Sequence, residues 1–85
     1  MANITLLALD VLKPLEPSIV DVSVRLAKIK GVSEVNIELI EIDRRVENIK
    51  VTLRGNNILF EDVQTAIEKC GATIHSIDQT TTVSK

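Results

Sequence analysis

The chain has 85 residues, 45% of them apolar and 26% charged, with a net charge of -2 and one aromatic side chain, Phe60. This length fits a single domain, and the composition is typical of a globular protein rather than a disordered chain. One cysteine excludes an internal disulfide framework. The longest apolar run, residues 6–9, is far shorter than the about 20 residues of a membrane helix.

The same features narrow the location and the partners. The N-terminus lacks the basic region and cleavage site of a signal peptide, so we expect a cytoplasmic protein. The chain lacks the basic charge balance of a nucleic-acid-binding protein. We therefore expect neither nucleic-acid nor membrane partners.

The first third of the chain predicts a strand followed by a helix. Residues 3–12 are short, aliphatic and uncharged before Asp10, which is typical of a buried central strand. Pro14 and Pro17 end this strand, and Pro17 suits the first turn of a helix. Apolar residues then recur at helical spacing from residue 19 to residue 29, and Gly31 ends the helix.

The rest of the chain predicts a hairpin, a second helix and a last strand. Residues 33–43 and 46–54 alternate as two strands around a polar turn. Asn57 is a good N-cap for a helix whose apolar face runs from Phe60 to Cys70. Residues 72–79 predict the last strand, and residues 79–85 are expected to fray.

The order strand, helix, strand, strand, helix, strand predicts an α+β, ferredoxin-like βαββαβ fold spanning residues 1–85 as one domain. Right-handed crossovers give a four-stranded antiparallel sheet of order 4-1-3-2 with both helices on one face. The other face should be polar, yet both alternating sets of the first strand are apolar. Ile40 and Ile42 are also out of phase with Ile37. A β-bulge would explain those two; otherwise the open face carries an aliphatic patch, and we favour self-association.

This topology also gathers acidic residues at one edge of the sheet. The end of the first strand, the hairpin turn and the start of the last strand meet there. Five of the 12 acidic residues lie at this edge: Asp10, Glu16, Glu41, Asp43 and Glu47. His75 and Ser76 are close to it, and Asp78 lies further along the last strand. Converging carboxylates are typical ligands of calcium. The alternative is a solvated loop end in which Lys13, Arg44 and Arg45 balance the acids.

Other motifs argue against catalysis. Cys70 lies on the apolar face of its helix, and no second cysteine accompanies it as a soft-metal ligand. His75 and Ser76 are neighbours on a strand and therefore point to opposite faces. The strands that would stack RNA bases hold no aromatic residue, and no glycine-rich phosphate loop is present. We expect no enzymatic activity.

Several segments resemble a family of small archaeal proteins known as domain of unknown function 211. They are residues 9–14, 16–19, 41–43, 47–52 and 74–78. The resemblance implies a ferredoxin-like domain, closed homo-oligomers and an association with calcium in some members. The polar motif positions of the family correspond to Asp10, Lys13, Glu16, Glu41, Asp43, Glu47, His75, Ser76 and Asp78. This chain departs from the family at Gln79, where relatives often carry an acidic residue. Gln79, together with Arg44 and Arg45, lowers the local negative charge.

Together these observations predict a non-catalytic homo-oligomer, for which a ring is plausible, that binds calcium through Asp10, Glu41, Asp43, Glu47 and Asp78. Lys13, Glu16, His75 and Ser76 are further candidates for a polar site. The alternative is a regulatory module that binds a small effector between protomers.

Overall fold

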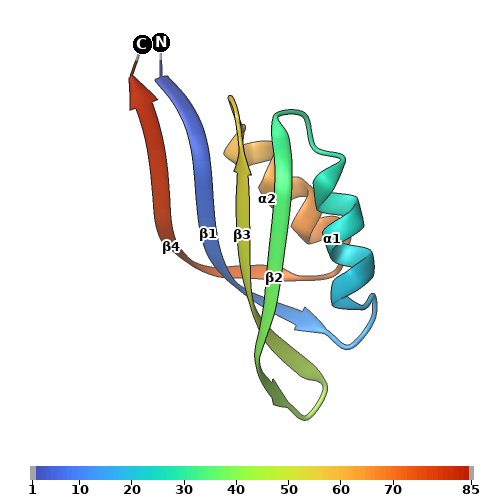
Figure 1. The fold of residues 1–85 in the computed structure, drawn as a ribbon. Helices are drawn as coiled ribbons and strands as arrows, with labels where there is room; N and C mark the ends of the chain where they lie inside the picture. Colours follow the sequence, from blue (N-terminus) through green and yellow to red (C-terminus); the bar gives the residue numbers. More distant parts are fainter. Residues whose placement is uncertain (1, 85) are drawn as a thin grey trace.

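Two helices pack against one face of a four-stranded sheet in the computed structural model, which describes residues 2–84 (Figure 1). The elements are β1 (Ala2–Pro14), α1 (Ile19–Ala27), β2 (Val32–Asp43), β3 (Val46–Gly55), α2 (Phe60–Lys69) and β4 (Thr73–Ser84). The strand order is β2-β3-β1-β4, and every neighbouring pair is antiparallel. The predicted topology, strand order and fold class are therefore confirmed.

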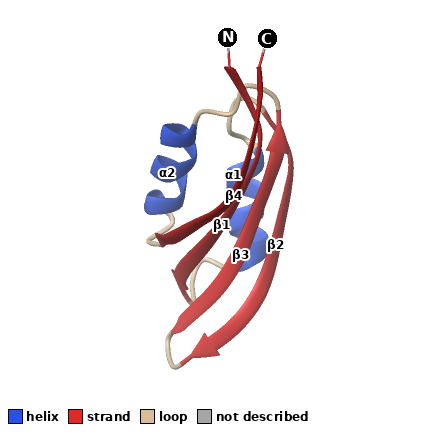
Figure 2. Ribbon diagram, turned by 90° about the vertical axis from the view of Figure 1, so that its left-hand side faces the viewer, coloured by secondary structure: helices blue, strands red, loops and turns tan. Residues whose placement is uncertain are grey.

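The core lies between the sheet and the helix layer, as Figure 2 shows. Alternate residues of the two central strands supply its floor, and the apolar stripe of each helix supplies its roof. The buried floor residues are Leu7, Leu9, Val11, Ile49, Val51 and Leu53; the helices add Val22, Leu26, Val63 and Ile67. No helix within residues 2–84 has the length and hydropathy needed to cross a membrane.

The two helices begin differently. The Ser18 hydroxyl accepts a hydrogen bond from the Asp21 N–H at 3.2 Å, so Ser18 is the side-chain N-cap of α1. The expectation that Asn57 caps α2 is wrong, because the N-cap is Leu59. Asn57 instead has a positive φ of 56°, and its N–H donates to the side chain of buried Asn3. The amide of Asn3 also donates to Asn56, so Asn3 ties β1 to the turn before α2.

A register shift in β2 explains the two out-of-phase isoleucines. The pairing with β3 skips one residue between Leu39 and Glu41, which is a β-bulge at Ile40. After the bulge Ile42 pairs with Glu47 and returns to the helix side of the sheet, while Glu41 and Asp43 turn to the open face. Ile40 and Ile42 nevertheless stay exposed, because the hairpin continues beyond the helices (Figure 1).

The predicted aliphatic patch does not lie at the centre of the open face. Leu6 and Ala8 point to that face but are buried, with exposed fractions of 9% and 2%. Polar residues of β3 and β4 flank them in register: Arg54 and Thr81 beside Leu6, Thr52 and Gln79 beside Ala8. The exposed aliphatic side chains gather instead along β2 and at the hairpin end.

The last strand is longer than predicted. The expectation that residues 79–85 fray is wrong for residues 79–84, because β4 runs to Ser84, and Thr82, Val83 and Ser84 pair with the first residues of β1; Lys85 lies outside the described residues. The start of β1 extends past the end of β3, so it offers a free partner to the β-branched residues of β4. Figure 1 shows the start of β1 beside the end of β4.

Candidate functional site

The five predicted calcium ligands lie in four places. Asp10 is at the middle of the sheet, opposite Lys50 of β3 and Ser76 of β4. Glu41 and Asp43 lie together on the open face of the hairpin end. Glu47 pairs with Lys13 on the helix side. Asp78 accepts a hydrogen bond from the Ser76 hydroxyl at 2.7 Å.

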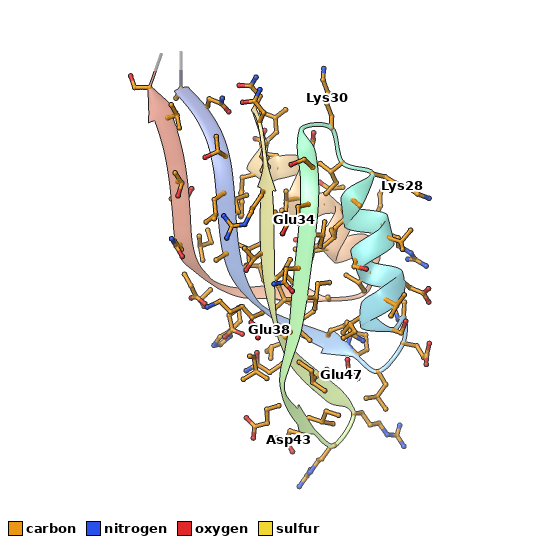
Figure 3. The ribbon with its side chains drawn as sticks, in the orientation of Figure 1. Lys28, Lys30, Glu34, Glu38, Asp43 and Glu47 are labelled. Atoms are coloured by element: carbon orange, nitrogen blue, oxygen red, sulfur yellow. The ribbon has the colours of Figure 1, made fainter. Side chains whose placement is uncertain are left out.

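One protomer therefore falls short of the oxygen ligands that calcium takes. Among residues 2–84 no three His, Cys, Asp or Glu side chains come close enough to hold a metal ion. Calcium takes about six to eight oxygens. Glu41 and Asp43 supply two carboxylates at the hairpin end, and Arg44 and Arg45 line the same place. Figure 3 shows Asp43 at the hairpin turn and Glu47 further up β3.

Lys13 is the most deeply buried charged residue of the candidate set. Its side chain has no exposed surface, and its ammonium is 2.9 Å from Oε1 of Glu47. The same nitrogen donates to the backbone carbonyls of Pro14, Leu15 and Pro17 at 2.7, 3.2 and 2.6 Å. Lys13 thus holds the loop between β1 and α1 against β3. Glu16 is exposed on that loop and takes no part in the ion pair.

His75, Ser76 and Asp78 of β4 are not arranged as a nucleophile with its base. His75 is exposed and lies where the pairing with β1 skips a residue. Ser76 donates to Asp78 rather than to His75. A nucleophile needs a base within hydrogen-bond reach that is itself oriented by a third group, and the Ser76 hydroxyl is instead held by the Asp78 carboxylate two residues away on its own strand.

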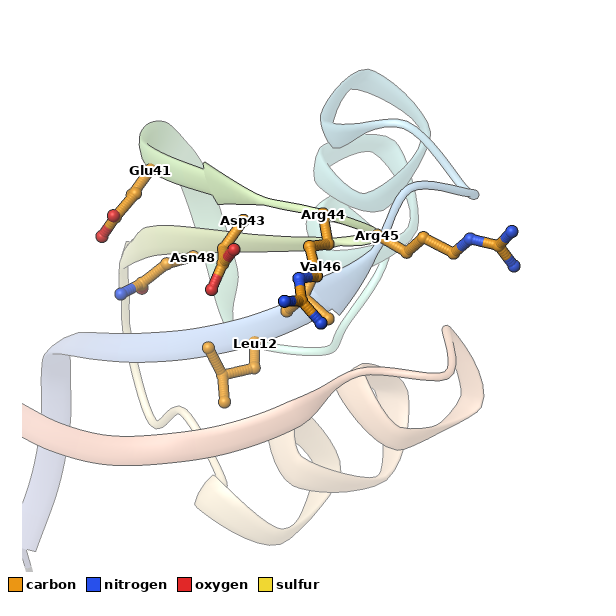
Figure 4. Close-up of a pocket in the computed structure, with 7 residues that line it drawn as sticks. All are labelled: Leu12, Glu41, Asp43, Arg44, Arg45, Val46 and Asn48. Atoms are coloured by element: carbon orange, nitrogen blue, oxygen red, sulfur yellow. The ribbon is translucent and has the colours of Figure 1, made fainter.

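A pocket at the hairpin end is the feature that sequence reasoning missed. It has a volume of about 600 Å³ and opens on the uncovered face of the sheet. We call it the hairpin pocket; it is lined by Leu12, Glu41, Asp43, Arg44, Arg45, Val46 and Asn48 (Figure 4). Cross-strand pairs build it, with Asn48 between Leu12 and Glu41, and Asp43 opposite Val46. The bulge at Ile40 creates it by turning Glu41 and Asp43 to this face.

The walls of the hairpin pocket combine apolar and charged groups. Leu12 and Val46 expose 36% and 42% of their surface. Figure 4 shows the Arg44 guanidinium beside Val46 in this view, while the Arg45 side chain extends outward. The side-chain oxygen of Asn48 is buried and has no hydrogen-bond partner among residues 2–84. The pocket therefore combines apolar side chains with charges of both signs, and one of its lining residues holds an unsatisfied acceptor beneath the surface.

The architecture and this site define a small ferredoxin-like domain with an open, partly charged sheet face. The chain belongs to the DUF211 family, described as uncharacterized ArCR, whose model matches residues 5–85. It is 47% identical over 79 residues to the uncharacterized protein MJ0319 of Methanocaldococcus jannaschii. That alignment covers 93% of this chain and 81% of the relative. The resemblance noted in the sequence is thereby confirmed at the level of the family.

Proposed function

We propose that the protein is a non-catalytic homo-oligomer that assembles through the β2 side of the molecule. The observation that carries this proposal is a set of five aliphatic side chains on α1 and β2, each between 44% and 66% exposed. We call it the β2 edge surface; it consists of Val20, Val24, Leu39, Ile40 and Ile42. An apolar surface of this kind typically marks a protein interface.

The backbone of β2 supports the same reading. This strand is 12 residues long and, within the part of the chain that the structure describes, pairs only with β3, so its other side presents unpaired N–H and C=O groups. A long edge strand with exposed aliphatic residues is a template for another strand. We therefore expect a strand of a neighbouring copy to cover it.

Charge favours β4 of a second copy as that strand. The 12 residues of β2 include Glu34, Glu38, Glu41 and Asp43 and no basic residue. Two copies of β2 side by side would place like charges opposite one another, which is destabilising. The other edge strand, β4, carries a single acid and the exposed Ile77. Pairing of β2 with β4 of the next copy is head-to-tail, and such contacts close into a ring when the rotation allows it.

Substitution of Ile42 tests the assembly. We expect Ile42→Gln to dissociate the oligomer at protein concentrations that keep the wild type assembled, because an amide replaces an apolar contact. Light scattering at matched concentrations measures the mass, and circular dichroism confirms the fold. Leu59→Gln is the control, since Leu59 is 56% exposed against 55% for Ile42 but lies next to α2. A monomeric wild type at micromolar concentration would overturn the proposal.

Calcium binding is proposed only for the assembled protein. Glu41 and Asp43 lie on β2, and a neighbouring copy on that edge would add oxygens to the two carboxylates. We expect calcium chloride to raise the melting temperature of the wild-type oligomer and to leave that of Ile42→Gln unchanged, because a ligand stabilises only the state that binds it. Magnesium chloride at the same ionic strength is the control. Equal shifts in the two proteins would contradict a site shared between copies.

A further inference from the structure

We propose that the hairpin pocket binds a small aliphatic amino acid, as a zwitterion. This goes beyond the assembly proposed above and differs from the effector alternative, because the residues that line the pocket belong to one protomer. Three features of the pocket carry the inference: its apolar floor, its opposite charges and its unsatisfied amide oxygen.

The apolar side chains of the hairpin pocket favour a ligand with an aliphatic group. Leu12 and Val46 come from neighbouring strands and leave a third or more of their surface exposed inside the hollow. A branched alkyl group laid on these two side chains removes apolar surface from water on both partners. The volume of about 600 Å³ lies within the range of small-molecule sites.

The charged residues at the rim of the pocket favour a ligand that carries a positive and a negative charge. Glu41, Asp43, Arg44 and Arg45 line the pocket, and the side chain of Arg45 extends outward, so two carboxylates and the Arg44 guanidinium remain at its rim. A simple anion would meet the acids and a simple cation would meet Arg44, and either mismatch is unfavourable. A zwitterion matches both signs. Its carboxylate suits the planar fork of arginine, and its ammonium suits the Asp43 carboxylate.

Asn48 adds a specific acceptor for the ammonium. Its side-chain oxygen has no partner, although buried polar atoms are normally hydrogen-bonded. Asn48 lies in the row between Leu12 and Glu41, directly on the pocket wall. Rotation of this amide about its last side-chain bond would turn the oxygen toward the ligand, and an ammonium supplies the donor that it lacks.

A nuclear magnetic resonance titration of the full chain tests the proposal. Leucine, isoleucine, valine and methionine are each added in turn, and the backbone signals of Leu12, Val46 and Asn48 are followed. We expect at least one of them to shift these signals with saturation. Probes that lack one group should bind at least tenfold more weakly than leucine: 4-methylpentanoate lacks the ammonium, isopentylamine lacks the carboxylate, and glycine lacks the aliphatic body.

Two variants and a control locate the site. Asp43→Asn and Arg44→Gly should each weaken binding at least tenfold. Arg44 has a positive φ of 59°, which glycine adopts readily, so Arg44→Gly should fold normally. Glu61→Gln on α2 should leave binding unchanged. The proposal is overturned if no amino acid of the panel shifts the pocket signals, or if isopentylamine binds as tightly as leucine.

Discussion

Replacement of Lys13 by methionine should lower the free energy of unfolding by about 3–5 kcal/mol, the usual cost of removing one partner of a buried ion pair. Methionine keeps the apolar stem, so the loss reports on the ammonium. Without it, the Glu47 carboxylate loses its ion-pair partner while only 17% of its side chain is exposed. The carbonyls of Pro14, Leu15 and Pro17 also lose their shared donor. Urea unfolding at a fixed protomer concentration measures the change.

The matched control is Lys50→Met on β3. Lys50 is exposed on the open face opposite Asp10, and we expect its replacement to change the stability by no more than about 0.5 kcal/mol. In the double variant Lys13→Met with Glu47→Gln the buried carboxylate is removed as well, so part of the lost stability should return. A cost below about 1 kcal/mol for Lys13→Met would show that the ion pair and the carbonyl cage contribute little.

The burial of Lys13 shows where sequence reasoning about the site ended. A lysine is almost never fully buried unless it is paired, so the sequence predicts Lys13 only as a candidate of a polar site or as a solvated charge that balances the acids. Its position in β1 and its apolar neighbours carry no sign of the carbonyl cage. The cage forms because the loop after β1 turns three backbone oxygens toward one point, and Glu47 arrives from a strand more than 30 residues away. Such convergence is a tertiary property.

The fold, in contrast, could be predicted because local patterns and topology rules agree. Helical spacing identified the buried faces through Val22 and Leu26 in α1 and through Val63 and Ile67 in α2. Alternation in β3 identified Ile49, Val51 and Leu53. The handedness of the crossovers then fixed the strand order.

The hairpin pocket escaped prediction because it depends on one extra residue. Strict alternation through β2 would place Glu41 on the same side as Leu39, since residues two apart share a face. The bulge at Ile40 reverses the alternation for every later residue of the strand, so Glu41 and Asp43 meet Asn48 and Val46 on the open face. The only signal was the pair of out-of-phase isoleucines, which indicated a bulge without saying which acids would move.

A second large effect is expected from Gly55→Ala. Gly55 ends β3 opposite Val32, where the two strands approach the turn after α1. A Cβ at this position would lie 1.9 Å from the carbonyl oxygen of Gly31 and 3.0 Å from the Cα of Val32. Both are backbone atoms, so no side chain can move aside to make room. We expect a loss of stability at or above the upper end of the usual overpacking range, about 3 kcal/mol.

Thermal unfolding measures this loss, and Gly71→Ala is the matched control. In a domain of this size, a loss of about 3 kcal/mol corresponds to a melting temperature lower by at least about 12 °C. Gly71 has a positive φ of 79°, but a Cβ there would meet only the Pro14 ring at 3.6 Å, an ordinary contact. Its replacement should therefore cost only about 1–2 kcal/mol of backbone strain. If the two variants melt at the same temperature, backbone conformation rather than the close approach of Gly31 and Gly55 governs both positions.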